Sequence, residues 1–295
     1  MIKTSLYVCA AALLSVVSAF SQLQQVEFAT YSEGAEPAVV NGVLVDNKGT
    51  LATIALLGSN PTKATIAGAA EGEKVELKLL AHDPVSRLTL LQLPEAHRKG
   101  ITVINATGDS SKLEPGDVLY SDLKNKAKIS RMVSNVERYN GKILPLTFLR
   151  MNHPDGKLPA GSPVMNAQDQ LIGFSFQKSK EGNSFFILPV EVLSHVQASL
   201  ARDGKYTPCW IGVSMDQGED TPVITSVRPE SPASKAGLKN GDILVNIGGK
   251  KIGTYAEVVN AFYYLQPGKA LEFRVLRGVE LKTVKVTPEI NPRYK

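Results

Sequence analysis

The stretch VVNGVLVDNKGTLATIALL, residues 39–57, gives the first indication of the fold. Two apolar runs, 39–45 and 51–57, flank the short polar segment 46–49, which contains Asp, Asn and Gly. Turn residues between two runs rich in β-branched side chains are typical of a β-hairpin. The stretch therefore predicts two antiparallel strands joined by a tight turn.

Short apolar segments continue on the C-terminal side of this hairpin, separated by Gly, Pro and Asp. Many short strands with such punctuation favour an all-β barrel or sandwich over a helical or α/β domain. The further strands that we expect lie at 75–80, 88–93, 117–120, 129–139, 143–148, 163–166 and 171–177.

The periodicity changes near residue 189. Apolar residues recur at helical spacing over 189–202, with Pro189 suited to a first turn and Gly204 to a helix end. This helix and the polar stretch after it predict a linker at 189–207. The last block contains further strand patterns and one helix at 255–265. A chain of 295 residues is long enough for two domains.

Composition excludes several classes of protein. The hydrophobic fraction of 43% and the charged fraction of 21% are those of an ordinary globular protein. The net charge is +5, but basic residues are interspersed with acidic ones, so we expect no nucleic-acid partner. We also expect no cofactor and no metal site.

The N-terminus has the pattern of an export signal. One lysine precedes an apolar run from Leu6 to Ala19, and Ala19 and Ser21 have the spacing of a signal-peptidase site. The alternative is a membrane anchor, but the run is shorter than the roughly 20 residues of a span. We expect a signal peptide at 1–21, a periplasmic or secreted protein, and no stable membrane insertion afterwards. Cys209 is then the one cysteine left, which we interpret as an idle thiol.

Six segments of the first domain form a recognisable series along the chain: 42–53, 83–91, 108–117, 163–166, 171–174 and 186–189. Taken in this order, they resemble the HtrA (DegP-like) trypsin-fold serine proteases. The resemblance implies a mainly β protein, with a trypsin-like double β-barrel at 22–188.

The same resemblance implies where a catalytic triad would lie. The positions of the family's histidine, aspartate and serine are held here by Leu56, Arg87 and Ala160. A serine nucleophile needs a histidine base that an aspartate orients. We therefore predict that the chain is not an enzyme but a pseudo-protease with no catalytic residue.

One alternative stays open: a serine endopeptidase of HtrA type with a displaced, non-standard catalytic residue set. Ser162 is then the candidate nucleophile, two residues after the expected position. It would need a base within about 3 Å, and no histidine of the chain is placed to serve it in this fold. The four are His82, His97, His153 and His195.

The C-terminal block closely resembles the PDZ domains of bacterial proteases, through segments 227–244, 246–252, 266–268 and 274–278. We place this α+β domain at 208–295. Such a domain implies that a peptide adds a strand to an exposed sheet edge, with its carboxylate held by backbone N–H groups.

We expect the peptide-binding residues on a loop and on the helix that faces it. Tyr255, Val259 and Phe262 share one helix face; the alternative is that Phe262 is core and Val258 lines the groove. These apolar walls predict ligands with hydrophobic C-termini. The loop residues are Trp210, Ile211, Gly212 and Val213.

Together these features predict an exported, non-catalytic protease homologue that binds peptides or protein C-termini through its PDZ domain. Its role would be that of a scaffold, a regulator or a chaperone-like protein in protein quality control. A homo-oligomer, a trimer in particular, is a further hypothesis, with Val26, Phe28 and Tyr31 as contact residues.

Overall fold

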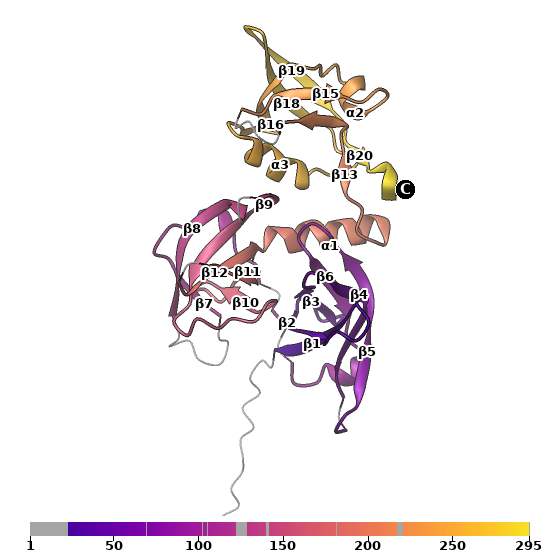
Figure 1. Ribbon diagram of the computed structural model, residues 1–295, viewed down its shortest axis with the longest axis vertical. Coiled ribbons are helices and arrows are strands. Elements are labelled where there is room, and N and C mark those ends of the chain that lie inside the picture. Colours follow the sequence, from indigo (N-terminus) through magenta and orange to yellow (C-terminus); the bar gives the residue numbers. More distant parts are fainter. Residues whose placement is uncertain are drawn as a thin grey trace, which may run out of the picture.

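A computed structural model describes residues 23–294, apart from 69, 102, 105, 122–128, 140–141, 181 and 217–220. The signal peptide expected at 1–21 lies outside the described residues. Figure 1 shows two barrels side by side, a long helix above them and a small domain at the far end.

The first barrel is closed, with the strand order β1-β2-β3-β6-β5-β4. The hairpin predicted from residues 39–57 is formed by β2 and β3, which pair Gly42 with Thr53. Asp46 stabilises the turn by accepting hydrogen bonds from the backbone N–H groups of Lys48 and Thr50, both at 2.9 Å. The strands are β1 (Gln24–Thr30), β2 (Ala38–Leu44), β3 (Thr50–Ile54), β4 (Ser59–Ala67), β5 (Lys74–His82) and β6 (Leu88–Gln92).

The second barrel is also closed, in the order β10-β11-β12-β9-β8-β7. One hydrophobic cluster joins Ile54 and Leu88 of the first barrel to Phe174 and Leu188 of the second, so the barrels share a core. The mainly β, double-barrel architecture expected from the sequence is confirmed. The strands are β7 (Val118–Tyr120), β8 (Ile129–Tyr139), β9 (Lys142–Asn152), β10 (Pro163–Met165), β11 (Leu171–Lys178) and β12 (Ser184–Pro189).

The linker helix α1 (Glu191–Asp203) lies across the barrels and buries Val192, Leu193 and Val196 against them. It starts two residues after the position that the sequence favoured, because Pro189, the last residue of β12, still pairs with Gly173 of β11. The helix ends at Gly204, whose φ of 69° is readily accessible only to glycine.

The C-terminal domain has its own core, formed around Leu244, Val258 and Phe273. Asp242 is fully buried there and receives two hydrogen bonds from Arg277, of 2.6 and 2.8 Å. The elements are β13 (Cys209–Trp210), β14 (Val213–Met215), β15 (Ile224–Val227), α2 (Pro232–Lys235), β16 (Ile243–Ile247), β17 (Lys250–Lys251), α3 (Tyr255–Tyr263), β18 (Leu271–Arg277), β19 (Glu280–Val286) and β20 (Glu289–Ile290). Short 3-10 helices η1 (Glu95–His97), η2 (Ser110–Lys112) and η3 (Pro292–Tyr294) complete the fold.

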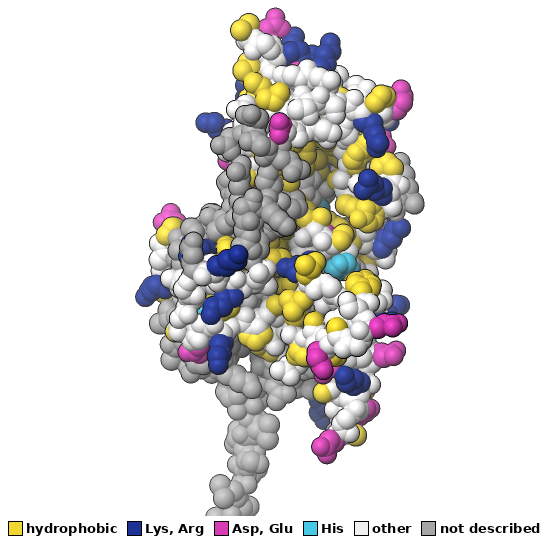
Figure 2. Space-filling model, viewed as in Figure 1, with side chains coloured by type: hydrophobic (Ala, Val, Ile, Leu, Met, Phe, Trp, Pro, Cys, Tyr) yellow, Lys and Arg dark blue, Asp and Glu magenta, His cyan; other side chains and the backbone are white. Residues whose placement is uncertain are grey.

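Helix α3 connects this domain to the barrels. The hydroxyl of Tyr263 donates a 2.6 Å hydrogen bond to the buried carboxylate of Asp83, which follows β5. The backbone N–H of Thr147 in β9 donates to the side chain of Asn260 at 2.9 Å. On the face drawn in Figure 2, hydrophobic side chains gather across the middle of the molecule, where these parts meet. The small domain is therefore docked on the barrels through the helix that we expected to line its groove.

Two of the expected oligomer contacts are not available on the surface. Val26 and Phe28 are fully buried in the first barrel, so they stabilise that core instead; Tyr31 is 69% exposed. Within the residues that the structure describes, no helix combines the length and the apolar character that a membrane span requires.

Candidate functional site

The three positions that the family resemblance assigned to a triad lie at the junction of the barrels. Leu56 follows β3, Ala160 precedes β10, and both pack half-buried against the core of the first barrel. Arg87 lies between β5 and β6 with a φ of 61°, and its guanidinium carbon is 4.0 Å from the centre of the Phe176 ring in β11. A backbone hydrogen bond connects the segments of Leu56 and Arg87, since the N–H of Ala55 donates to the Arg87 carbonyl at 3.0 Å.

Ser162 is 1% exposed, and its hydroxyl is engaged in the same junction. It donates to the Pro159 carbonyl at 2.7 Å and accepts from the Asn41 side-chain amide at 2.8 Å. Gly161, with a φ of 78°, packs so tightly that an added Cβ would overlap the Asn41 carbonyl oxygen. The hydroxyl therefore closes a tight turn against β2, and any attack by it requires the bond to Pro159 to break first.

The histidine rings described next contact residues other than Ser162. His82 in β5 shares a 2.9 Å hydrogen bond with the hydroxyl of Thr89, and burial lowers the pKa of its ring. His153 is 5% exposed and lies edge-on to Phe185, with ring centres 6.0 Å apart. His195 in α1 packs against Tyr263, with ring centres 4.8 Å apart, and burial lowers its pKa as well. Within the described residues, the hydroxyl of Ser162 thus bonds to Pro159 and Asn41 rather than to an imidazole.

The loop predicted to hold a peptide carboxylate has a conformation that requires glycine. Gly212 has a φ of 82°, and an added Cβ would overlap Ser231. Its carbonyl accepts the backbone N–H of Arg228 at 2.8 Å. Ile211 is buried in the core of the C-terminal domain, whereas Trp210 and Val213 on either side are half-buried. The loop is therefore fixed between β13 and β14.

Arg228 is a charged neighbour of this loop that the sequence analysis did not single out. Its side chain is exposed, and its guanidinium carbon lies 5.9 Å from the centre of the Trp210 ring. The signal was present in the motif at 227–244, where an arginine immediately precedes Pro229. Its role could be recognised only once the backbone contact with Gly212 placed it beside the loop.

Helix α3 begins with a capping box, in which Thr254 and Glu257 each accept a backbone hydrogen bond from the other. Tyr255 is 8% exposed, and Phe262 is half-buried and stacks on Phe273, with ring centres 6.0 Å apart. Val259 is also half-buried, while Val258 is fully buried in the core.

The burial of Cys209 raises the pKa of its thiol to about 12, so it stays protonated at neutral pH.

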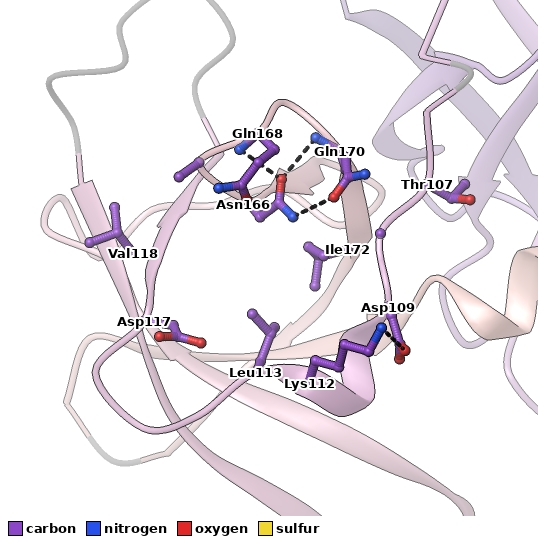
Figure 3. A pocket seen from close by; sticks show the side chains of 12 residues that line it. Thr107, Asp109, Lys112, Leu113, Asp117, Val118, Asn166, Gln168, Gln170 and Ile172 are labelled. Carbon is purple, nitrogen blue, oxygen red and sulfur yellow. Dashed lines mark hydrogen bonds and ion pairs between the residues drawn. The ribbon is translucent and has the colours of Figure 1, made fainter.

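A separate pocket of about 630 Å³ lies on the second barrel beside η2 (Figure 3). Four of its polar side chains form two pairs: Asn166 donates to Gln170 at 2.9 Å, and Lys112 pairs with Asp109 at 3.3 Å. Leu113 and Ile172 point into the space between them. None of the predicted site residues lines this pocket.

The C-terminal domain matches the family model described as "PDZ domain" over residues 209–287. A curated relative, "Probable periplasmic serine endoprotease DegP-like" from Ectopseudomonas mendocina, is 26% identical over 72% of this chain and 48% of its own length. "Serine protease Do-like HtrA" from Bacillus subtilis is 27% identical over 73% of this chain and 55% of its own. The chain thus spans about half the length of the curated relatives that it matches.

Solved structures share the fold at lower identity. "HtrA-type protease AlgW with tripeptide" is 18% identical, with a TM-score of 0.67 over 92% of this chain and 94% of that one. A "serine endoprotease from Yersinia pestis" is 20% identical, with a TM-score of 0.58 over 91% and 94%.

These comparisons correct one prediction. The chain was expected not to be an enzyme, but its relatives are named as serine endoproteases, which points to a protease. The prediction rested on three side chains at aligned positions and on the view that no other residue could take over their roles. The described chain carries a PDZ domain and is a homologue of the HtrA/DegP serine proteases with a trypsin-like fold.

Proposed function

We propose that this chain is an HtrA-type protein that binds peptides or protein C-termini in the PDZ groove between β14 and α3. The observation that carries the proposal is the loop at Gly212, whose left-handed backbone is fixed against Ser231. The residues assigned to the groove are Trp210, Ile211, Gly212, Val213, Tyr255, Val259 and Phe262.

An extended peptide would bind by adding a strand to β14. That strand pairs only with β15, through Val213 and Val227, in a sheet of two strands among the described residues. Its other edge can therefore donate and accept main-chain hydrogen bonds. The exposed guanidinium of Arg228 would attract the terminal carboxylate beside Gly212. Val213 and Phe262 would contact an apolar C-terminal side chain.

Binding is tested by titrating the full-length mature protein with peptides that have hydrophobic C-termini, each as the free acid and as the amide. The free acids should bind and the amides should bind more weakly. Gly212→Asp places a side chain against Ser231 and a negative charge in the loop, so binding should be lost. Gly278→Asp in the β18–β19 hairpin, where the surrounding space is open, is the matched control. Equal affinity of Gly212→Asp and the wild type would contradict the proposal.

The proposal includes the setting of the protein. We place it in the periplasm or outside the cell after removal of residues 1–21, with domains at 22–188 and 208–295 joined by a linker at 189–207. Its role would be regulatory or chaperone-like in protein quality control, as a homo-oligomer such as a trimer. N-terminal sequencing of the exported protein and its mass in solution test the cleavage site and the oligomeric state.

A second function is favoured by the names of the two relatives described above, one a probable serine endoprotease and the other a serine protease. Hydrolysis would then depend on a non-standard residue set, with Ser162 as the candidate nucleophile. A fluorophosphonate probe should label Ser162, and Ser162→Ala should abolish cleavage of an unfolded protein. Ser226→Ala, on the exposed face of β15, is the control. Cleavage that Ser162→Ala leaves intact would exclude this serine.

A further inference from the structure

A second pocket of about 630 Å³ opens on the second barrel and shares no lining residue with the proposed peptide groove. It is formed where the ends of β8 and β9 meet the turn between β11 and β12. Its lining is dominated by hydrogen-bond donors and contains no carboxylate among the described residues. The lining residues are Arg131, Arg150, Asn152, His153, Pro154, Gly182, Asn183 and Ser184.

The two loops that form this pocket are held together by their own hydrogen bonds. His153 N–H donates to the Asn183 carbonyl at 2.9 Å, and Lys178 Nζ donates to the Gly156 carbonyl at 3.1 Å. An added Cβ at Gly156 would lie 2.6 Å from Asn183 Oδ1, so that amide packs directly on the glycine backbone. The pocket walls are therefore preorganised rather than dependent on a ligand for their shape.

Arg131 supplies an accessible positive charge at the rim. Its Nη1 donates to the Gly116 carbonyl at 3.0 Å, which leaves the rest of its guanidinium fork for another acceptor. Its side chain is exposed and forms no ion pair within the described chain.

The remaining polar residues of the lining also supply hydrogen-bond donors. Asn152 Oδ1 accepts the Ser184 hydroxyl at 2.7 Å, which orients its amide and leaves the Nδ2 donor for another partner. Arg150 and His153 contribute further nitrogen atoms from β9 and the residue after it. Asp155 is the nearest acid along the chain in this loop, and it does not line the pocket.

From this arrangement we propose that the pocket binds a small ligand through an oxyanion, either a phosphate or a carboxylate group. A guanidinium presents parallel N–H donors whose geometry matches both kinds of group. Its charge-assisted hydrogen bonds are stronger than neutral ones, and neutral amide donors would add further hydrogen bonds to the same anion. The cavity volume leaves room for a ligand larger than a single anion. Its lining residues differ from those assigned to the proposed peptide groove and to the barrel junction.

The test uses the full mature protein in calorimetric titrations with inorganic phosphate and with citrate, at constant ionic strength set by sodium chloride. We expect saturable binding of at least one of them at millimolar concentrations. Arg131→Gln should weaken it about tenfold, because one charge-assisted contact is lost. Asn183→Ala should weaken it less, without any change of charge. Arg274→Gln, an exposed arginine of β18, is the matched control and should bind as the wild type does.

The two anions distinguish the sources of the oxyanion. Phosphate binding alone assigns the site to phosphorylated ligands, and citrate binding alone assigns it to carboxylates. An equal loss in Arg131→Gln and Arg274→Gln would mean that only net charge matters, and would overturn the proposal. So would the absence of binding by both anions, or unchanged binding in Arg131→Gln. Thermal unfolding of each variant shows that the fold is retained.

Discussion

The sequence motifs predicted functional residues both at the barrel junction and in the PDZ loop. The two regions differ in whether their polar and charged groups contact other residues of the chain or remain exposed. At the junction, Arg87 covers the Phe176 ring and the Ser162 hydroxyl closes a turn. At the loop, Gly212 keeps the backbone in a left-handed conformation beside the exposed cation of Arg228. Groups satisfied within the chain contribute to stability, whereas groups left for an outside partner contribute to binding. Substitutions at the two places should therefore separate these effects.

The largest effect is expected for Gly161→Ala at the junction. The new methyl group would overlap the Asn41 carbonyl oxygen, in a backbone conformation that L-residues avoid. We expect the free energy of unfolding to fall by about 3 kcal/mol or more, with peptide affinity of the remaining folded protein unchanged. Chemical denaturation and peptide titration measure the two effects. Gly58→Ala, also left-handed but surrounded by open space, should cost only about 1 kcal/mol.

A similar loss at both glycines would show that backbone conformation alone accounts for the effect, and that the contact with Asn41 contributes little.

The PDZ counterpart is Asp242→Asn, which tests stability in the domain that we propose to bind the peptide. Burial alone would raise the pKa of Asp242, but the hydrogen bonds and charge of Arg277 hold it below its ordinary value. Removing one partner of a buried ion pair lowers the free energy of unfolding by several kcal/mol. Because Arg277 is partly exposed, we expect a decrease of about 2 kcal/mol in Asp242→Asn. Calorimetric unfolding of the full chain gives this value.

The acid dependence of the same pair has a definite sign. Because the folded pKa of Asp242 is lowered, its contribution is complete above the unfolded pKa of about 3.9 and is lost as pH falls through the folded pKa. The wild type should therefore lose more stability than Asp242→Asn below about pH 4. Parallel acid curves for the two proteins would contradict the assigned cause.

The sequence predicted most of the fold but only part of the site. The strands at 129–139 and 171–177 agree with β8 and β11 within one residue. Strand β4 was not predicted, because its sequence SNPTKATIA contains a proline and polar residues and has no clear alternation. It forms because β1 and β5 pair with it on both sides. Such pairing depends on barrel closure, which local sequence does not encode.

The site residues that the sequence missed depend on contacts between distant segments. Arg228 is recognised by its backbone bond to Gly212, and the anion pocket joins Arg131 to Asn183 across two loops. Helix α3 carries apolar side chains on more than one face, and the helical pattern could not show that Tyr263 would reach Asp83 in the first barrel. Periodicity identifies a buried face but not the element that buries it.

Ser162→Ala tests whether the junction hydroxyl contributes to stability. The substitution removes the bond to the Pro159 carbonyl and leaves the Asn41 amide without this acceptor. Losing such a buried hydroxyl should lower the free energy of unfolding by about 1–2 kcal/mol. Peptide affinity should not change. A variant as stable as the wild type would show that the two hydrogen bonds add nothing net.

Arg228→Gln should have a smaller and different effect. The exposed guanidinium has no acidic partner within the described chain, so the unfolding free energy should stay within about 0.5 kcal/mol of the wild type. Affinity for a free-acid peptide should fall about tenfold through loss of a charge-assisted contact, and affinity for the amide should barely change. Lys251→Gln, on the exposed edge strand β17, is the control. An equal loss for acid and amide would remove Arg228 from the carboxylate site.

The smallest effect is expected from His195, where the linker helix meets α3. Burial lowers the pKa of its imidazole; Asp83 partly opposes this, and Arg202 adds to it. Tyr206, Tyr263 and Tyr264 face the same ring. Since the folded pKa lies below the unfolded value of about 6.5, protonation favours unfolding. Stability should be constant above that pH and decrease as pH falls towards the folded pKa.

The expected decrease from pH 7.5 to 5.5 is on the order of 1 kcal/mol or less. The free energy of unfolding of His195→Gln should depend less steeply on pH than that of the wild type. Part of the dependence should remain, because burial also lowers the pKa of His82. His97→Gln, in the short helix η1, is the control for replacing a histidine elsewhere in the chain. If His195→Gln follows the wild-type curve, the imidazole between α1 and α3 does not contribute to the pH dependence of stability, and the assigned cause is wrong.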